Sequence, residues 1–184
     1  MQALGAGCAS CGPSNIRYGY DKLGRLNQQT ALDEKGQPLL ATQSELDELG
    51  RTTRVSRIEY RDGKAQKPQW TTRYEYQGNS SQPSLIATPS VLAGKEHQIR
   101  ISYNPYGQAT EVTETGYSPL QEKPISRTTT YTYQTINNRS LLTRIDGPLK
   151  NGPKADPSDS DITTITWDAK GNAVQSMTQP GGFT

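Results

Sequence analysis

Three groups of residues have types and spacings that could support chemistry. Cys8 and Cys11 form a Cys-x-x-Cys pair in GCASCGP, and His97 is the only histidine of the chain. A polar segment further on carries Asp156, Asp159 and Asp161. Such patterns are typical of zinc or redox sites, of acid–base catalysis and of calcium binding, respectively.

None of the three groups is complete. The chain has no further cysteine, so Cys8 and Cys11 could form a local disulfide or have no role, or be half of a shared metal site, or be a redox pair. His97 is followed by Gln98 and Ile99, which excludes the His-x-Glu of a zinc deaminase, and no Gly-x-Ser-x-Gly elbow occurs. The acidic segment lacks the spacing and glycine of an EF-hand. We therefore predict no catalytic, cofactor-binding or metal site, and no enzymatic activity.

The overall composition indicates a thin, turn-rich β protein. The 184 residues include 10 tyrosines but one phenylalanine, 17 glycines and 12 prolines, and only 31% are hydrophobic. A formal net charge of +2 gives no footprint for nucleic acid, and no stretch is apolar enough to span a membrane. The densest basic run, Arg51, Arg54 and Arg57, is predicted to be a solvated strand edge.

A five-residue pattern recurs along the chain: a bulky residue, Asp or Asn, two free positions, and Gly. It occurs as YDKLG, LDEKG, LDELG, YNPYG and WDAKG, and its first three copies are 12 and 14 residues apart. Asp or Asn at the start of a type I turn accepts backbone hydrogen bonds, and Gly at its end takes a positive φ, which closes a hairpin with a bulge. The predicted turn residues are Tyr20, Asp21, Gly24, Asp33, Gly36, Asp47, Gly50, Asn104, Gly107, Asp168 and Gly171.

The segments between these turns alternate polar and apolar residues with a period of two, as in TTRYEYQ, HQIRISYN, TTTYTYQ and DITTITWD. This pattern predicts an all-β fold of antiparallel hairpins in a curved sheet. SELDELG also allows one turn of helix, but a hairpin turn is favoured. We expect an irregular segment over 1–16, hairpins over 17–178 with loop insertions at 78–94 and 146–161, and a tail over 179–184.

Three stretches, YGYDKLGRL, ISYNPYGQATEV and ITWDAKGNAV, resemble the YD repeats of RHS proteins. This family includes bacterial polymorphic toxins, the shell subunits of insecticidal toxin complexes and the animal teneurins. The resemblance covers roughly residues 17–178. It implies hairpins laid side by side in a spiral that closes into a shell around a C-terminal toxin or effector.

On this resemblance, the chain is expected to be a structural segment of such a shell in an exported bacterial protein, secreted or at the cell surface. Its expected partners are the remaining YD-repeat segments and the enclosed toxin, and open strand edges predict self-association. The Asp-Pro-x-Gly-Leu signature that ends bacterial shells is missing, because Asp156-Pro157 continues with Ser158-Asp159. Self-cleavage and toxicity are therefore not implied for this chain.

The tyrosines provide an alternative function, a carbohydrate-binding β module at the cell surface. Tyr74, Tyr76, Tyr131 and Tyr133 could stack on the sugars of a cell-surface glycan. Cross-strand ladders that stabilise a thin sheet explain the same four rings just as well. Of the two interpretations we favour the ladders.

Overall fold

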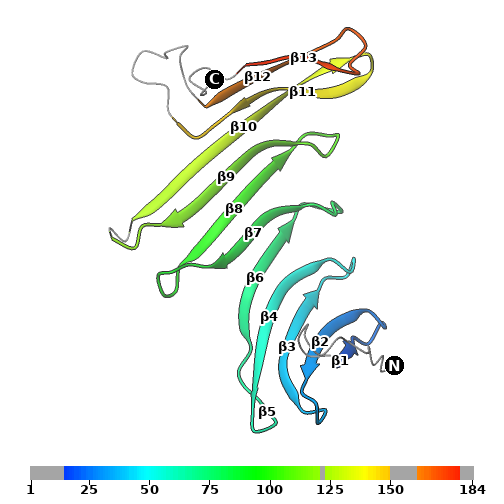
Figure 1. Ribbon diagram of the computed structural model, residues 1–184, viewed down its shortest axis with the longest axis vertical. Coiled ribbons are helices and arrows are strands. Elements are labelled where there is room, and N and C mark those ends of the chain that lie inside the picture. The colour runs from blue at the N-terminus through cyan, green and yellow to red at the C-terminus, as the bar shows by residue number, and fades with distance from the viewer. Residues whose placement is uncertain (1–14, 121–122, 150–160, 179–184) are drawn as a thin grey trace. The chain divides into compact units, whose positions relative to one another are not determined.

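The computed structural model describes residues 15–120, 123–149 and 161–178, and all the elements in these ranges are β-strands paired antiparallel. The predicted all-β, antiparallel fold class is therefore confirmed (Figure 1). The chain divides into two compact units, Met1–Pro89 and Ser90–Thr184. The described ranges contain no helix that could cross a membrane.

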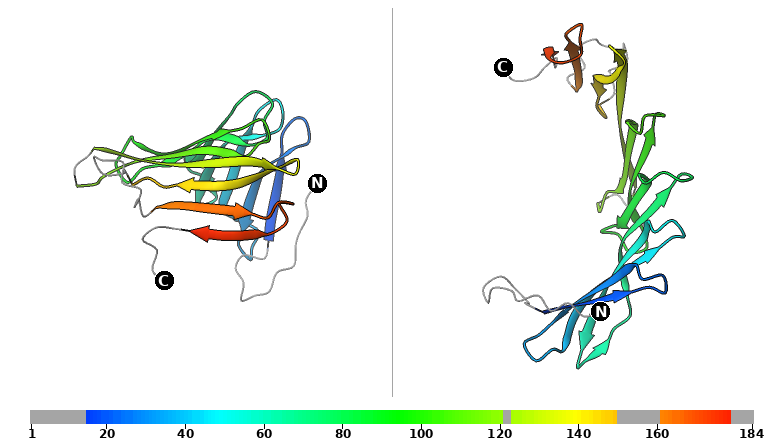
Figure 2. Two further views of the ribbon diagram at one scale, coloured as in Figure 1. Left: turned by 90° about the horizontal axis from the view of Figure 1, so that it is seen from above. Right: turned by 90° about the vertical axis from the view of Figure 1, so that its right-hand side faces the viewer.

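In the first unit the strands follow one another side by side in chain order, as Figure 1 and the right-hand view of Figure 2 show. The short strand β5 pairs with the last two residues of β4, Tyr60 and Arg61, and β6 pairs with the middle of β4, residues 54–57. The strands are β1 Asn15–Tyr20, β2 Leu26–Leu32, β3 Pro38–Leu46, β4 Thr52–Arg61, β5 Lys64–Ala65, β6 Gln69–Tyr76 and β7 Pro83–Pro89.

The core of the first unit is a row of residues that face each other across three strands. Thr30 pairs with Ala41, and Ala41 pairs with Ile58; the three are 3%, 0% and 7% exposed. Leu85 and Ala87 of β7 are also buried. Such a small core agrees with the low hydrophobic content and leaves much of the stability to hydrogen bonds between strands.

The buried residues of β7 correct one prediction. The segment 78–94 was expected to be a loop insertion because it is rich in Pro and Ser, but its centre forms β7. The two prolines at 83 and 89 begin and end this strand, which is where proline is tolerated, so they delimit the strand without interrupting it.

The second unit has the same architecture, with six strands in chain order. Gly171 is its only buried residue among those described, and the strand residues are half-buried or exposed. The strands are β8 Glu96–Tyr103, β9 Ala109–Tyr117, β10 Pro124–Ile136, β11 Arg139–Asp146, β12 Ile162–Trp167 and β13 Val174–Thr178.

Strand direction alternates along the chain, so successive turns lie at opposite ends of the strands. We call these two ends of each unit its edges. In the first unit, the turns after β1, β3 and β6 share one edge, whereas the turn at Asp33, between β2 and β3, lies at the other. We call the edge with the turns of Asp21 and Asp47 the motif edge. In the second unit, the motif edge carries the turns of Asn104 and Asp168. The 12- and 14-residue spacings between the first three copies therefore add up to one structural repeat. This repeat consists of a motif-edge hairpin and the turn that connects it to the next hairpin.

Two further turns have a different geometry. Asp62 and Gly63 join β4 to β5, and Asn137 and Asn138 join β10 to β11 at the motif edge. All four residues have positive φ, between 49° and 72°. Two consecutive positive φ values are typical of the two-residue type I′ hairpin, for which Asn and Asp-Gly are favoured.

The remaining boundaries follow the prediction in part. The first strand begins at Asn15, two residues before the predicted start of the hairpins. SELDELG continues β3 to Leu46 and then turns, so no helix forms there. Residues 1–14, with Cys8 and Cys11, most of the predicted loop 146–161, and the tail 179–184 lie outside the described residues.

Candidate functional site

The recurring turns are closed as the sequence predicts. In the first copy, Asp21 Oδ1 accepts the backbone N–H groups of Leu23 and Arg25, both at 2.9 Å, and the Gly24 N–H donates to the Asp21 carbonyl at 3.0 Å. The same backbone hydrogen bond from Gly to Asp or Asn recurs in the other four copies. The turn glycines have φ between 68° and 82°, which a residue with a Cβ adopts only at a cost. The turn glycines are Gly24, Gly36, Gly50, Gly107 and Gly171.

The residue after the glycine adds a contact within the turn. Arg25 Nε lies 2.6 Å from Asp21 Oδ2, and Arg51 Nε lies 2.7 Å from Asp47 Oδ2. The pKa of Asp21 is lowered, and the largest cause is the hydrogen bond from the backbone N–H of Arg25. Burial alone would raise the pKa of Asp47, but hydrogen bonds from the Arg51 side chain and backbone lower it overall.

The Asn104 turn uses a neutral version of the same contact. Asn104 Nδ2 donates to Gln108 Oε1 at 2.9 Å, while Asn104 Oδ1 accepts the backbone N–H groups of Tyr106 and Gln108. At Asp21 and Asp47 a charged turn residue is thus matched by an arginine four positions on, and at Asn104 a neutral turn residue is matched by a glutamine.

The same residue also reaches the turn of the next hairpin, and we call this the forward contact. Arg25 Nη1 donates to the Asp47 carbonyl at 2.8 Å. In the second unit, Gln108 Nε2 donates to the Ser140 carbonyl at 3.0 Å and Ser140 Oγ donates to Gln108 Oε1 at 2.6 Å. Two further forward contacts link Arg51 Nη1 to the Gly78 and Ser80 carbonyls, both at 2.7 Å, and Arg139 Nη1 to the Gly171 carbonyl at 2.8 Å.

All four residues that make forward contacts follow a residue with positive φ. This position places a long polar side chain at the motif edge, beside the adjacent turn. Arginine is suited to it because one guanidinium can bind its own turn through Nε and the next turn through Nη1. A backbone carbonyl has two lone pairs, so each forward contact adds a donor to a carbonyl of the neighbouring hairpin at or near its turn.

A second contact runs in the opposite direction, and we call it the backward contact. An aromatic ring in the last part of the strand that enters a motif-edge turn donates a hydrogen bond to the strand that leaves the preceding motif-edge turn. Tyr76 Oη donates to the Thr52 carbonyl at 2.8 Å, and Tyr133 Oη to the Ala109 carbonyl at 2.9 Å. Trp167 Nε1 makes the same contact with the Leu142 carbonyl at 2.8 Å.

The acceptor of the backward contact is an equivalent residue each time. Each acceptor pairs with the bulky residue at the β-bulge of the preceding hairpin: Leu46 with Thr52, Tyr103 with Ala109, and Tyr133 with Leu142. Burial of their rings raises the pKa of Tyr76 and of Tyr133, which keeps both hydroxyls protonated as donors.

Each motif-edge hairpin also contains a β-bulge, and a side-chain hydroxyl makes a hydrogen bond at several of these bulges. Thr53 has no partner in the register between β3 and β4, and its Oγ1 donates to the Glu45 carbonyl at 3.2 Å. Thr110 and Thr143 do the same to Ser102 and Thr132, at 3.3 and 3.2 Å. The hydroxyl therefore satisfies a carbonyl where the ladder is locally disrupted.

The four tyrosines singled out in the sequence are all half-buried. Tyr76 and Tyr133 make backward contacts, while Tyr74 lies opposite Ile86 and Tyr131 opposite Ile145 in the register. These cross-strand pairs agree with the ladder interpretation.

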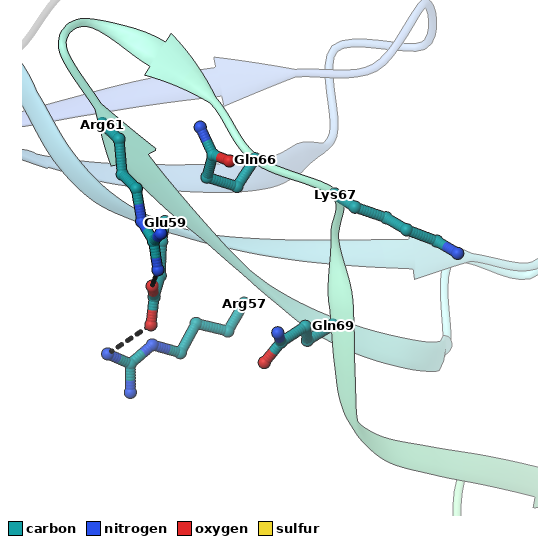
Figure 3. A pocket seen from close by; sticks show the side chains of 6 residues that line it. All are labelled: Arg57, Glu59, Arg61, Gln66, Lys67 and Gln69. Atoms are coloured by element: carbon teal, nitrogen blue, oxygen red, sulfur yellow. Dashed lines mark ion pairs between the residues drawn. The ribbon is translucent and has the colours of Figure 1, made fainter.

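The basic run behaves in two ways. Arg51 precedes β4, its side chain is only 19% exposed, and it makes the contacts described above, which corrects the prediction of a solvated edge for this residue. Arg54 and Arg57 on β4 are exposed by about half. Figure 3 shows Arg57, Glu59 and Arg61 beside a hollow of about 220 Å³, with ion pairs from Glu59 to both arginines at 3.4 and 3.8 Å.

The candidate chemical residues are placed as follows. His97 Nε2 on β8 lies 2.7 Å from Glu114 Oε1 on the neighbouring strand β9, beside a hollow of about 160 Å³. Asp161 Oδ2 accepts the Leu149 N–H at 2.6 Å, and Asp156 and Asp159 are outside the described residues. Within the described ranges, no three His, Cys, Asp or Glu side chains are grouped as a metal site would require.

Sequence reasoning identified the turn residues but missed the residues that connect one turn to the next. A signal was present: Asp is followed four residues later by Arg at Asp21 and Asp47, and Asn by Gln at Asn104. The Asn137-Asn138 turn was also missed, because it lacks the Asp-x-x-Gly pattern. The residues that were missed are Arg25, Arg51, Gln108, Arg139, Asn137 and Asn138.

The comparisons with known proteins give a distant likeness among solved structures. No protein-family model matches the chain, and no curated protein matches its sequence significantly. Among solved structures, the chain is similar to one chain of the Photorhabdus luminescens Tc holotoxin pore. The two are 19% identical with a TM-score of 0.44, and the match covers 84% of this chain and 9% of that one.

Proposed function

We propose that the chain is a non-catalytic structural segment of a larger YD-repeat shell, which encases or presents a C-terminal toxin or effector in an exported bacterial protein. The observation that supports this proposal is the repeated pair of forward and backward contacts. Forward contacts join neighbouring hairpins at four places, and backward contacts accompany them at three of these. A wall of hairpins needs such connections, because each hairpin has too small a core to be stable alone.

The proposal is tested by the size of the protein in its source cells. An immunoblot with an antibody against this chain should show a band many times larger than 20.2 kDa, because the segment would belong to a long repeat protein. A band near 20.2 kDa in untreated cells, with no larger form, would contradict the shell proposal and favour a free-standing binding module.

The alternative function, a carbohydrate-binding module, is favoured by one observation. Tyr106, at the tip of the Asn104 turn, is 75% exposed, so its ring is open to stack on a sugar. Titration with oligosaccharides, followed by tyrosine chemical shifts, would then give a saturable change that is lost in Tyr106→Ala. Unchanged shifts across the titration would exclude this alternative for the oligosaccharides used.

A further inference from the structure

The first strand of the described fold has one open side. β1 pairs with β2 and, within the described residues, with no other strand. It leads into the Asp21 turn, which has the same capping geometry as the Asp47 turn. The hydrogen-bond donors and acceptors on this open side can therefore be compared with those that later hairpins use at the equivalent side.

β1 carries the donor of a backward contact, and none of the described residues accepts from it. Tyr20 precedes its turn as Tyr76 and Trp167 precede theirs. Those two side chains donate to a carbonyl of the neighbouring strand, whereas the Tyr20 hydroxyl makes no hydrogen bond within the described part of the chain and the residue is 48% exposed. A large aromatic side chain at an open edge, with its donor unpaired, is typical of an interaction surface.

The acceptor of a forward contact is present as well. The Asp47 carbonyl accepts two hydrogen bonds, from the Gly50 N–H at 3.0 Å and from Arg25 Nη1 at 2.8 Å. The Asp21 carbonyl accepts the equivalent Gly24 N–H at 3.0 Å and, among the described side chains, no arginine or glutamine. One of its lone pairs is therefore available to a donor from outside.

We propose that the open edge of β1 binds the outgoing strand of a further YD-type hairpin, and that this partner is recognised by an Arg or Gln directly after its turn glycine. The partner's Arg or Gln donates to the Asp21 carbonyl, and Tyr20 donates to the partner carbonyl that is equivalent to that of Thr52. The occupant follows from the internal interfaces of the chain, where the same two contacts recur. This inference rests on the proposed structural function and adds a rule for the partner's sequence.

The rule distinguishes this site from ordinary pairing at a strand edge. Backbone hydrogen bonds alone would accept any extended strand. The two side-chain contacts require a turn glycine, a long donor after it, and a carbonyl at a fixed position beyond it. They therefore fix the register and the direction of the partner.

The test uses the full chain and a labelled synthetic peptide of residues 38–61, which contains β3, its turn and β4. Binding is followed by fluorescence anisotropy, and its location by hydrogen exchange. We expect saturable binding and new protection of the β1 amides 15–20. An Arg51→Ala peptide should bind about tenfold more weakly, because a hydrogen bond from a charged donor is lost.

A change in the protein tests the other half of the contact. Tyr20→Phe should weaken binding about three- to tenfold, since only the hydroxyl is removed. Tyr106→Phe is the matched control, because it removes a hydroxyl from another exposed turn tyrosine, and it should leave binding unchanged. Circular dichroism checks that both variants keep the wild-type fold.

Three outcomes would overturn the inference: no binding of the wild-type peptide, equal binding of the two peptides, or protection of β13 in place of β1. None of them bears on the immunoblot, so a large band together with a peptide that does not bind would refute the partner rule and leave the shell proposal standing.

Discussion

The guanidinium carbon of Arg51 lies 4.5 Å from the centre of the Tyr76 ring, whose hydroxyl donates to the carbonyl of Thr52. One arginine thus closes its own turn through Asp47, binds the carbonyls of the next turn, and packs on the ring that makes the backward contact. The forward and backward contacts between these two hairpins therefore meet at a single side chain.

Removing the Arg51 side chain should lower the stability of the fold more than removing a neighbouring arginine. Arg51→Ala is expected to lower the free energy of unfolding by about 2–4 kcal/mol, from the lost charged hydrogen bonds and the cation–π contact. Arg51→Lys should recover little of this loss, because an ammonium group cannot bind Asp47 and the next turn together in this geometry. Urea denaturation measures both changes.

Arg54→Ala is the matched control for this comparison. Arg54 is 45% exposed and lies 3.6 Å from an exposed Glu45, so its removal should cost at most about 0.5 kcal/mol. Equal losses for Arg51→Ala and Arg54→Ala would show that the forward contact does not stabilise the fold.

The match between turn residue and following residue predicts a rescue. Asn104→Asp should destabilise the second unit by about 1 kcal/mol, because the new carboxylate faces the Oε1 atom of Gln108, which now accepts from Asn104 Nδ2. Adding Gln108→Arg should restore stability, because Asp21 with Arg25 has this combination. A double-mutant cycle by urea denaturation measures the coupling, and additive effects of the two changes would argue against matched pairs.

Two turn glycines differ in the space around them. A Cβ added at Gly24 would have no atom within 4 Å. Gly24→Ala should therefore lower the free energy of unfolding by about 1–2 kcal/mol, from the positive φ alone. At Gly171 an added Cβ would lie 2.8 Å from Leu141 Cδ1 and 3.5 Å from Ile136 Cγ2. Gly171→Ala should therefore cost about 1 kcal/mol or more beyond Gly24→Ala in thermal or urea unfolding. Equal costs would mean that Leu141 moves aside freely.

The turn carboxylates make stability depend on pH in the acid range. The pKa values of Asp21 and Asp47 are lowered in the folded state, so the unfolded chain binds more protons there. Their stabilising contribution is present above about pH 4, the ordinary range of an aspartate, and is lost as the pH falls through the lowered folded values. Asp47→Asn should therefore flatten the dependence of unfolding free energy on pH between about 5 and 2.5.

Asp62→Asn is the control for this pH series. The Asp62 side chain has no hydrogen bond or ion pair within the described residues, and its positive φ of 51° is one that Asn tolerates. This variant should keep the wild-type pH dependence. If both variants behave alike, the contact between Asp47 and Arg51 is not the source of the effect.

Most of the local structure could be predicted from the sequence because its causes are local. Asp21 and Gly24 close a turn through atoms within five residues, and alternating residues specify the strands between turns. The forward contact of Arg25 could not be predicted in this way. Its acceptor is 22 residues away, and it is adjacent only because strands β2 and β3 return the chain to the motif edge.

The errors have equally specific causes. Composition assigned 78–94 to a loop, although Leu85 and Ala87 at its centre are buried in β7. The regular spacing of the Asp21, Asp33 and Asp47 turns suggested one kind of repeat. Strand alternation places the middle turn at the opposite edge, where Gln37, the residue after Gly36, makes no side-chain hydrogen bond to another turn within the described residues.

The forward and backward contacts have a consequence for how such a chain can lengthen in evolution. A hairpin such as β10–β11 carries its own means of attachment on both sides: Arg139 after the turn binds the hairpin that follows, and Tyr133 before the turn binds the hairpin that precedes. A duplicated gene segment that encodes one hairpin would therefore supply both of its new interfaces at once. Growth by tandem copying would need no compensating substitutions in the neighbours, and a few positions per copy would remain under selection while the rest of each strand drifted.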